Sequence, residues 1–175
     1  MNMLYYLAYG SNLHPLRLTV RVPSARFLGL TKLSGYELRF HKRHEPDASG
    51  KCNMYQTGQE TDTVIGAIYA MQASEKPLLD RCEGPGYLCD TMRVDYAGKP
   101  HDCFVYIAED SHIDDELVPY CWYKNIVLLG AEYHCMPQPY LAQIRGVPVT
   151  RDPDEARHRL HYDLIDQMKN YQESE

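Results

Sequence analysis

The chain opens with Leu4-Tyr5-Tyr6-Leu7-Ala8-Tyr9-Gly10-Ser11-Asn12-Leu13, an apolar run followed by a short polar segment. The run predicts a strand at about 4–9, and Gly10 interrupts it. Glycine lets the backbone approach a ligand closely, while Ser11 and Asn12 add side-chain donors beside the exposed N–H groups of a turn. The stretch therefore predicts either an anion-binding turn or an ordinary strand that runs into a polar turn.

A second polar feature is the carboxylate of Glu83, which ends a short helical pattern just before Gly84-Pro85-Gly86. Ser74 is expected as the N-cap of this helix, and Pro77 falls in its first turn. The macrodipole is negative at a helix C-terminus, so the pKa of Glu83 should rise if the carboxyl is also shielded from water. The alternative is a solvated glutamate with no chemical role.

Composition limits the classes of protein and partner. The 175 residues are 44% apolar and 24% charged, which is typical of one globular domain, here residues 1–175 with a flexible tail at 171–175. The net charge of −6 argues against nucleic acid or an anionic membrane as the partner. The local basic run at 39–44 is expected to be a solvated strand end.

Cysteines and histidines give no sign of a disulfide framework or of a metal centre. The six cysteines contain no C-x-x-C pair, and no stretch of the chain resembles a leader or a membrane span, so free thiols and a cytoplasmic location are expected. His158 and His161 have helical spacing near Glu155, but no third ligand is evident. No metal and no other cofactor is expected.

The order of elements is strands first and helices late. The second and third strands are expected to pair through Ser34-Gly35, and the last two strands through a hairpin at 97–100. The last helix is expected to begin with a capping box of Asp152, Pro153 and Glu155. Strands are expected at 4–9, 25–31, 36–41, 52–56, 63–71, 88–96 and 101–107. Helices are expected from the N-cap at Ser74 to Glu83, after 119, at 139–145 and after 152. The apolar stripe of the last helix is expected at Ala156, Leu160, Leu164, Ile165 and Met168.

Five motifs in this order resemble the γ-glutamylcyclotransferases, within the γ-glutamylcyclotransferase-like or AIG2-like superfamily. The match spans about 4–146, and the joint occurrence of the glycine turn and the Glu-Gly pair at this separation makes it specific. The resemblance implies an α+β fold, a small mixed β-barrel of about six strands with surrounding helices; the C-terminal helix lies outside the match. The motifs are Tyr9-Gly10-Ser11-Asn12-Leu13, Val64-Ile65-Gly66-Ala67-Ile68-Tyr69, Leu79-Asp80 with Glu83-Gly84, Tyr123-Lys124 with Ile126, and Gly130-Ala131-Glu132 with Pro137.

The activity that this resemblance implies is cyclisation of a γ-glutamyl compound to 5-oxoproline, with release of the amine or amino acid that the glutamyl group carried. Glu83 is the candidate general base and then acid. Residues Tyr9, Gly10, Ser11, Asn12 and Leu13 are the candidate substrate-binding turn, which supplies donors to the carbonyl oxygen and the α-carboxylate. Tyr87 and Tyr123 are candidates for lining the cavity, with ordinary core packing as the alternative.

Two other functions are consistent with the same residues. One is a serine amidase with Ser11 as nucleophile, although the sequence assigns it no base. The other is a non-catalytic module of the same fold that binds a small carboxylate or a protein. The partner is expected to be a small γ-glutamyl molecule; the leaving group and the oligomeric state stay open, a homodimer being one of the options.

Overall fold

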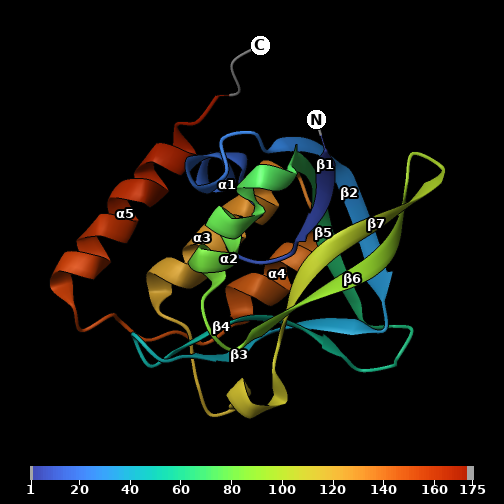
Figure 1. The fold of residues 1–175 in the computed structure, drawn as a ribbon. Helices are drawn as coiled ribbons and strands as arrows, with labels where there is room; N and C mark the ends of the chain where they lie inside the picture. The colour runs from blue at the N-terminus through green and yellow to red at the C-terminus, as the bar shows by residue number, and fades with distance from the viewer. Residues whose placement is uncertain (1, 173–175) are drawn as a thin grey trace.

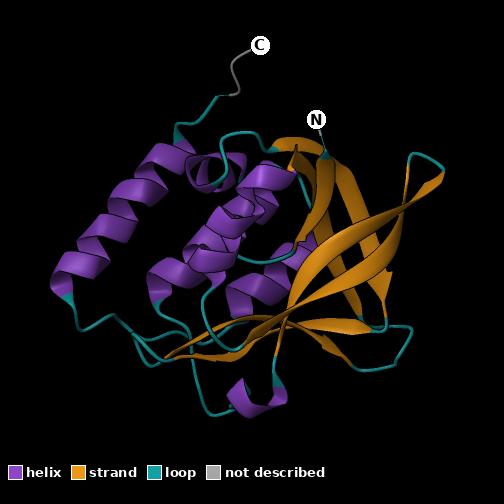
Figure 2. Cartoon of the chain, in the orientation of Figure 1, coloured by secondary structure: helices purple, strands orange, loops and turns teal. Residues whose placement is uncertain are grey.

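A computed structural model describes residues 2–172 of the chain. Figure 1 shows a curled sheet on one side of the molecule, helices packed against its concave side, and a smaller two-stranded sheet across one end. Figure 2 separates the same layers by secondary structure. The expected α+β class is confirmed. The expected flexibility of the tail falls largely on residues outside the described range.

The main sheet has five strands in the order β2-β5-β1-β7-β6. β1 is central, because it pairs antiparallel with β5 and parallel with β7. A strand with neighbours on both sides is shielded from water along both edges, and its residues Leu7 and Ala8 are fully buried. The strands are β1 (Met3–Ala8), β2 (Arg26–Ser34), β5 (Thr63–Gln72), β6 (Tyr87–Tyr96) and β7 (Lys99–Ala108).

The sheet curls until its two edge strands meet. At this junction the hydroxyl of Tyr96 on β6 donates to the carbonyl of Leu28 on β2. A side chain at Gly29 would start 2.2 Å from the Tyr96 ring, so only glycine allows this approach. The result is a half-barrel of five strands, which corresponds to the expected small mixed barrel.

The remaining two strands, β3 (Tyr36–His44) and β4 (Ser49–Gln56), pair with each other in a separate sheet. The expected pairing of the second and third strands is therefore wrong, since β2 pairs with β5 instead. Gly35, at φ 83°, turns the chain from one sheet to the other. Its carbonyl accepts from Thr57 and Gly58, which ties the turn to the far end of β4.

The basic run at 39–44 is not a solvated strand end, contrary to expectation. Lys42 is only 1% exposed, and its Nζ donates to the carbonyl of Pro85 at 2.7 Å. His41 is also buried, and its Nδ1 lies 2.6 Å from a carboxylate oxygen of Asp115. The register of β3 shifts between Arg39 and Lys42, and beyond this shift both side chains lie in the interior.

Five α-helices and two 3-10 turns complete the described chain. α1 was not predicted: Pro15 is its first residue, and the ring of His14 accepts the N–H of Leu16 in place of a usual capping side chain. Ser74 lies inside a 3-10 turn and does not cap α2. The helices are α1 (Pro15–Arg21), α2 (Lys76–Glu83), α3 (Cys121–Tyr133), α4 (Gln138–Gly146) and α5 (Glu155–Lys169), and the 3-10 turns are η1 (Ala73–Glu75) and η2 (Asp110–His112).

The start of α5 differs from the expected capping box. Asp154, not Asp152, is the N-cap, and it accepts the N–H of Arg157. Asp152 is fully buried and pairs with Arg157 and with the indole N–H of Trp122. Only the C-terminal part of the expected apolar stripe is buried, at Ile165 and Met168, whereas Leu160 is 66% exposed and Ala156 is also exposed.

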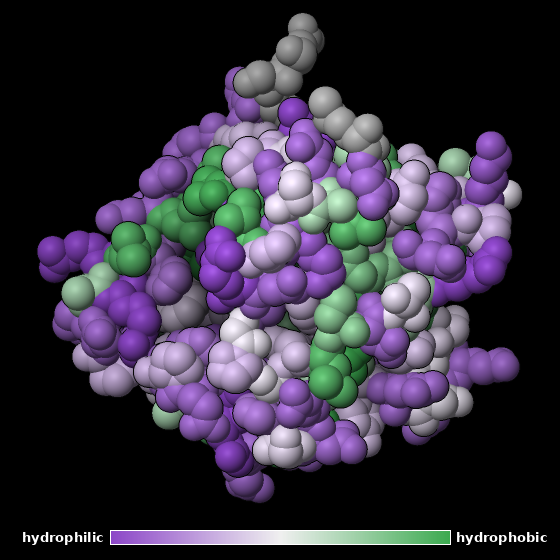
Figure 3. All heavy atoms as spheres, in the orientation of Figure 1, coloured by the Kyte–Doolittle hydropathy of each residue, from purple (hydrophilic) through white to green (hydrophobic). Residues whose placement is uncertain are grey.

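The surface is consistent with the charged composition. Figure 3 shows a face on which hydrophilic side chains predominate and apolar patches are small. Among residues 2–172, no helix combines the length and the apolar character needed to cross a bilayer.

Gly130 lies on α3 where this helix packs closely against the turn after β1. A Cβ there would lie 2.6 Å from the Cβ of Leu13 and 2.9 Å from the backbone nitrogen of His14. We expect Gly130→Ala to lower the free energy of unfolding in urea by about 1–3 kcal/mol, since overpacking against backbone outweighs the better helix propensity of alanine. Gly146→Ala on α4 is the matched control, because its Cβ would meet nothing within 4 Å. Equal effects at both glycines would contradict this packing argument.

Candidate active site

The carboxylate of Glu83 lies at the end of α2, where the expected helix stops. Gly84 follows at φ 69°, a conformation that favours glycine, and turns the chain toward β6. The Glu83 side chain is only 15% exposed. Its Oε1 accepts a hydrogen bond of 2.7 Å from the amide nitrogen of Asn12. The two pieces that the sequence singled out, the turn after β1 and the end of α2, are therefore in direct contact.

Asn12 is held by bonds at both ends of its amide. Its nitrogen also contacts the hydroxyl of Tyr6 at 3.1 Å, and its oxygen accepts from Nη1 of Arg21 at 2.9 Å. The residue is 3% exposed. Arg21 fixes which end of the amide is the acceptor, so the nitrogen must face Glu83.

Burial raises the pKa of Glu83 above its ordinary value. Four neighbours oppose this rise: the charge of Arg21, the hydrogen bond from Asn12, and the charges of Arg17 and Lys42. Nη1 of Arg21 lies 3.9 Å from Oε1 of Glu83. A carboxyl in this environment can exchange a proton near neutral pH more readily than a solvated glutamate, which is what a general base and acid requires.

The turn after β1 requires glycine because of a close approach to β4. A Cβ on Gly10 would lie 2.8 Å from the Cβ of Cys52. The N–H of Leu13 donates to the Gly10 carbonyl and closes the turn. The Leu13 side chain is fully buried, and its carbonyl accepts from Tyr69 and contacts His134. Leu13 was a candidate for substrate binding, but it lines neither cavity described below.

Tyr87 and Tyr123 converge on the backbone of Cys52 from opposite sides. The hydroxyl of Tyr87, at the start of β6, donates to the Cys52 carbonyl. The hydroxyl of Tyr123, on α3, accepts the Cys52 N–H at 3.0 Å. The ring of Tyr87 also lies 4.5 Å from Nζ of Lys42, a cation–π distance. Both tyrosines are thus fixed beside Glu83 by β4.

Two cavities meet at Glu83. The inner one is narrow, about 20 Å³, and the outer one is wider, about 210 Å³. They share Ser11, Glu83, Tyr87 and Tyr123, so the cavities adjoin at the carboxylate. The inner cavity is lined in addition by Tyr6, Tyr9, Gly10, Asn12, Cys52 and Tyr106, and the outer one by Arg17, Arg21, His44, Pro46, Asp47, Lys51, Cys82, Trp122, Arg157 and His161.

Several of these residues were missed at the sequence level. Arg17 and Arg21 are spaced four apart on α1, so both project from one face of a helix that begins directly after the glycine turn. That spacing was a usable signal, but α1 itself was not predicted. Tyr6 and Tyr106 come from the neighbouring strands β1 and β7, whose parallel pairing could not be inferred from alternation alone.

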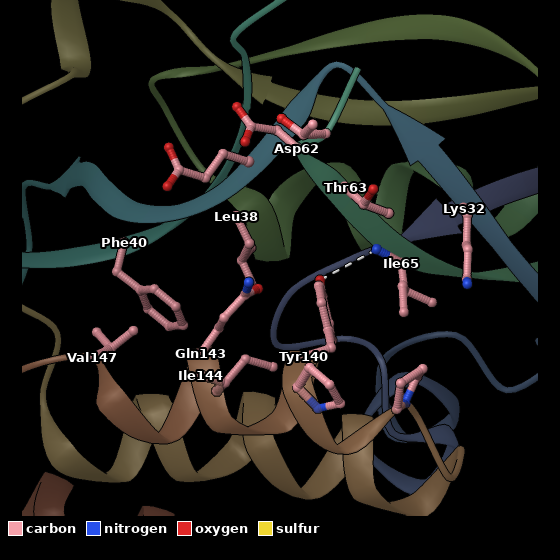
Figure 4. A pocket seen from close by; sticks show the side chains of 14 residues that line it. Lys32, Leu38, Phe40, Asp62, Thr63, Ile65, Tyr140, Gln143, Ile144 and Val147 are labelled. Atoms are coloured by element: carbon pink, nitrogen blue, oxygen red, sulfur yellow. Dashed lines mark hydrogen bonds between the residues drawn. The ribbon is translucent and has the colours of Figure 1, made fainter. Parts of the chain in front are cut away.

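A larger cavity lies elsewhere. Figure 4 shows it between α4 and the strands β2, β3 and β5, with Leu38, Ile65 and Ile144 on its walls. Its volume is about 480 Å³. Tyr140 projects from α4, and its hydroxyl accepts the Ile65 N–H at 3.3 Å. None of the candidate catalytic or binding residues lines this cavity, so it is not the candidate site.

His158 and His161 on α5 do not form part of a ligand cluster. Within residues 2–172, no group of three or more His, Cys, Asp or Glu side chains is placed to hold a metal ion. The ring of His161 stacks on Trp122 at 3.6 Å between centroids and borders the outer cavity. Burial lowers the pKa of His161 to about 4, so this ring is neutral at pH 7.

Together these features define a class of protein: a small α+β domain with a curled mixed sheet and a buried carboxylate at the junction of two cavities. A family model described as AIG2-like matches residues 63–144, which include α2 and Glu83. Gamma-glutamylcyclotransferase from Mus musculus is 27% identical over 172 residues, covering 94% of this chain and 87% of the relative. The protein of the same name from Homo sapiens is 26% identical with the same coverage.

Solved structures agree with the sequence comparison. A structure described as a gamma-glutamyl cyclotransferase superposes with a TM-score of 0.81 at 24% identity, covering 95% of this chain and 99% of that one. An uncharacterized protein from Homo sapiens superposes with a TM-score of 0.78 at 26% identity and the same coverage. The expected resemblance to the γ-glutamylcyclotransferases is therefore confirmed in sequence and in fold.

The first prediction from this geometry concerns the proton affinity of Glu83. Arg21→Met removes the largest opposing influence on its pKa, so we expect that pKa to rise further, because the ionised carboxylate loses a nearby positive charge. A ¹³C NMR titration of the Glu83 carboxyl measures the change. Arg81→Met is the control: Arg81 is exposed on the same helix and is not among the main influences on this pKa. An unchanged pKa in Arg21→Met would contradict the assigned electrostatics.

Proposed function

We propose that this chain is a γ-glutamylcyclotransferase that converts a γ-glutamyl amine, amino acid or peptide to 5-oxoproline. The observation that carries the proposal is the contact of Glu83 with Asn12, which brings one buried carboxylate to within hydrogen-bond distance of the glycine turn. The similarity to proteins named gamma-glutamylcyclotransferase over most of the chain supports it. The reaction is an acyl transfer within one molecule and releases the amine as in a lyase.

The proposed mechanism begins with the substrate bent over Glu83, at the junction of the two cavities. Its α-ammonium group gives a proton to Glu83, and the free amine then attacks its own γ-carbonyl carbon. Because nucleophile and electrophile belong to one molecule and form a five-membered ring, holding the bent conformation supplies much of the rate. The raised pKa of Glu83 suits this proton transfer.

Collapse of the tetrahedral intermediate completes the reaction. The carbonyl oxygen carries negative charge until the bond to the leaving nitrogen breaks, and Glu83 returns its proton to that nitrogen. The ring nitrogen gives up its second proton, which Glu83 passes to the departing amine. The products are 5-oxoproline and a protonated amine, and no water is consumed. The N–H groups of Gly10, Ser11 and Asn12 and the Ser11 hydroxyl are the proposed donors to this oxygen and to the substrate α-carboxylate.

Tyr9, Tyr87 and Tyr123 are proposed to shape the cavity. Their hydroxyls are bonded to backbone groups: Tyr9 donates to Tyr106, while Tyr87 and Tyr123 engage Cys52. The rings are thereby held rigidly around the space in which the glutamyl chain must fold. A rigid wall favours the bent substrate over extended conformers.

The serine amidase alternative has little support from the geometry. Among the described residues, no base makes a hydrogen bond to the Ser11 hydroxyl, as a nucleophilic serine requires. The binding-module alternative gives no reason for a carboxylate to be buried at the end of α2.

All six cysteines of the chain are free. Cysteines kept as thiols are typical of a reducing compartment. On this ground a cytoplasmic location is part of the proposal.

Glu83→Gln tests the proton-transfer role. Glutamine keeps the size and the acceptor oxygen that faces Asn12 but cannot carry the proton, so we expect kcat for 5-oxoproline release from γ-glutamyl dipeptides to fall by about 10²- to 10⁴-fold. Product is measured directly by chromatography. Glu60→Gln, at an exposed position, is the control and should leave kcat unchanged. Activity of Glu83→Gln within a few-fold of wild type would rule out the role.

Ser11→Ala separates the donor role from the nucleophile role. A donor that assists neighbouring N–H groups contributes only part of the oxyanion stabilisation, so we expect kcat to fall by about 10- to 10³-fold while turnover remains measurable. A steady-state assay of 5-oxoproline gives the residual rate. Complete loss of turnover in a protein that still binds substrate would instead favour Ser11 as a nucleophile.

A further inference from the structure

The turn that follows Glu83 is held in its middle by a lysine from another strand. Gly84 and Gly86 have φ of 69° and 86°, so residues with the widest conformational freedom stand on both sides of Pro85. Pro85 has no N–H, and its carbonyl is its backbone hydrogen-bonding group. That carbonyl accepts from Nζ of Lys42 at 2.7 Å. Through this bond the middle of the turn is tied to β3.

Lys42 is buried without a carboxylate beside it. The residue is 1% exposed, and among residues 2–172 no acidic side chain forms an ion pair with its Nζ. A buried ammonium is costly to keep unless its surroundings compensate the charge. The Pro85 carbonyl and the face of the Tyr87 ring, 4.5 Å from Nζ, supply part of this compensation. Burial lowers the pKa of Lys42, and the charge that most opposes this is that of Glu83.

Lys42 lines neither of the cavities that meet at Glu83, so it affects the site through its neighbours. Pro85 and Tyr87 both follow Glu83 closely in the chain, and Lys42 contacts both of them. Tyr87 lines the two cavities, and its hydroxyl is fixed by the carbonyl of Cys52. Lys42 and Cys52 therefore hold the segment after α2 at two separate points.

We propose that Lys42 is a positioning residue for the reaction: it holds the turn after Glu83 so that the carboxylate and the Tyr87 ring keep a fixed spacing around the substrate. This inference rests on the proposed function. Helix α2 ends at Glu83, so the place of the carboxylate depends on the turn that follows as well as on the helix. A misplacement of about 1 Å can cost on the order of 10²-fold in rate.

The charge of Lys42 has a second effect on the same carboxyl group. It favours the ionised form of Glu83 and so lowers the pKa of that group. Without this charge the pKa of Glu83 is higher, so the base form is lost at a higher pH and the acidic limb of the kcat/KM profile moves to higher pH. The other groups that face Glu83 are Asn12, Arg17 and Arg21, those that face Lys42 are Glu45, Asp47 and Lys51, and the surrounding tyrosines, all with raised pKa, are Tyr6, Tyr9, Tyr87 and Tyr123.

Lys42→Met tests both effects, because methionine keeps an unbranched side chain but has neither the charge nor the donor. With the γ-glutamyl dipeptide that wild type uses best, we expect kcat to fall by about 10- to 100-fold while KM stays within a few-fold. The acidic limb of the pH profile should move to higher pH. Lys99→Met, at an exposed position at the start of β7, is the matched control and should change neither quantity.

Two further measurements do not depend on activity. The ¹⁵N order parameters of the Gly84, Gly86 and Tyr87 amides should fall in Lys42→Met, because the middle of the turn has lost its bond to β3. A ¹³C titration of the Glu83 carboxyl should show the higher pKa. Thermal unfolding checks the fold, which should persist because the substitution removes a buried charge. If Lys42→Met does not fold, Lys42→Gln, which also lacks the charge, takes its place with the same expected rise in the pKa of Glu83.

The outcomes separate this inference from the proposed function. A kcat of Lys42→Met within a few-fold of wild type, or a lower kcat with unchanged order parameters in the turn, would overturn the positioning role. An unchanged pKa of Glu83 would overturn the charge effect. If wild type itself releases no 5-oxoproline from any γ-glutamyl compound, the proposed function has failed; lower order parameters in Lys42→Met would then still support the hold on the turn, and unchanged ones would overturn it.

Discussion

The candidate site depends on one side-chain amide. Asn12 donates to Glu83 and accepts from Arg21, and it can do both only because the two ends of an amide have opposite hydrogen-bonding character. An aspartate would repel Glu83, and a serine could not span both partners. The contact also joins the turn after β1 to the end of α2. The same hydrogen bond therefore sets the position of the Glu83 carboxylate and the position of the N–H donors of the turn.

Buried charge surrounds this contact to an unusual extent. Lys42, Lys51 and Arg17 are all less than 10% exposed, and each lies in or near the wall of the site. The first two are stabilised locally, Lys42 by the Pro85 carbonyl and the Tyr87 ring and Lys51 by Asp47. Arg17 and Lys42 limit the rise in the pKa of Glu83 that burial would otherwise cause, and Arg17 and Lys51 line the outer cavity.

The sequence predicted the elements with strong local signals. The positions of β1, β5, β6 and β7 follow from apolar and β-branched runs, and the glycine turn and Glu83 follow from residue chemistry. The features that depend on long-range contacts were not predicted. The burial of Lys42 follows from the register shift in β3. The pairing of β2 with β5 depends on the direction that the chain takes at the Gly35 turn. Helix α1 has no usual capping residue, because His14 takes that role. The contact between Asn12 and Glu83 spans 71 residues, and no local pattern encodes it.

The way Cys52 is held has a consequence for how activity would be lost on unfolding. Its backbone is bonded by Tyr87 from β6 and Tyr123 from α3, and its side chain lies against Gly10. Four segments far apart in the sequence thus meet at one residue, and fraying of any of them would open the cavity walls while most backbone hydrogen bonds survive. Residues 63–144, which the AIG2-like model covers, contain the carboxylate but neither the glycine turn nor β4. Local fraying of any one of these segments would then be enough to remove activity, and mild denaturant should abolish it before the circular dichroism spectrum changes.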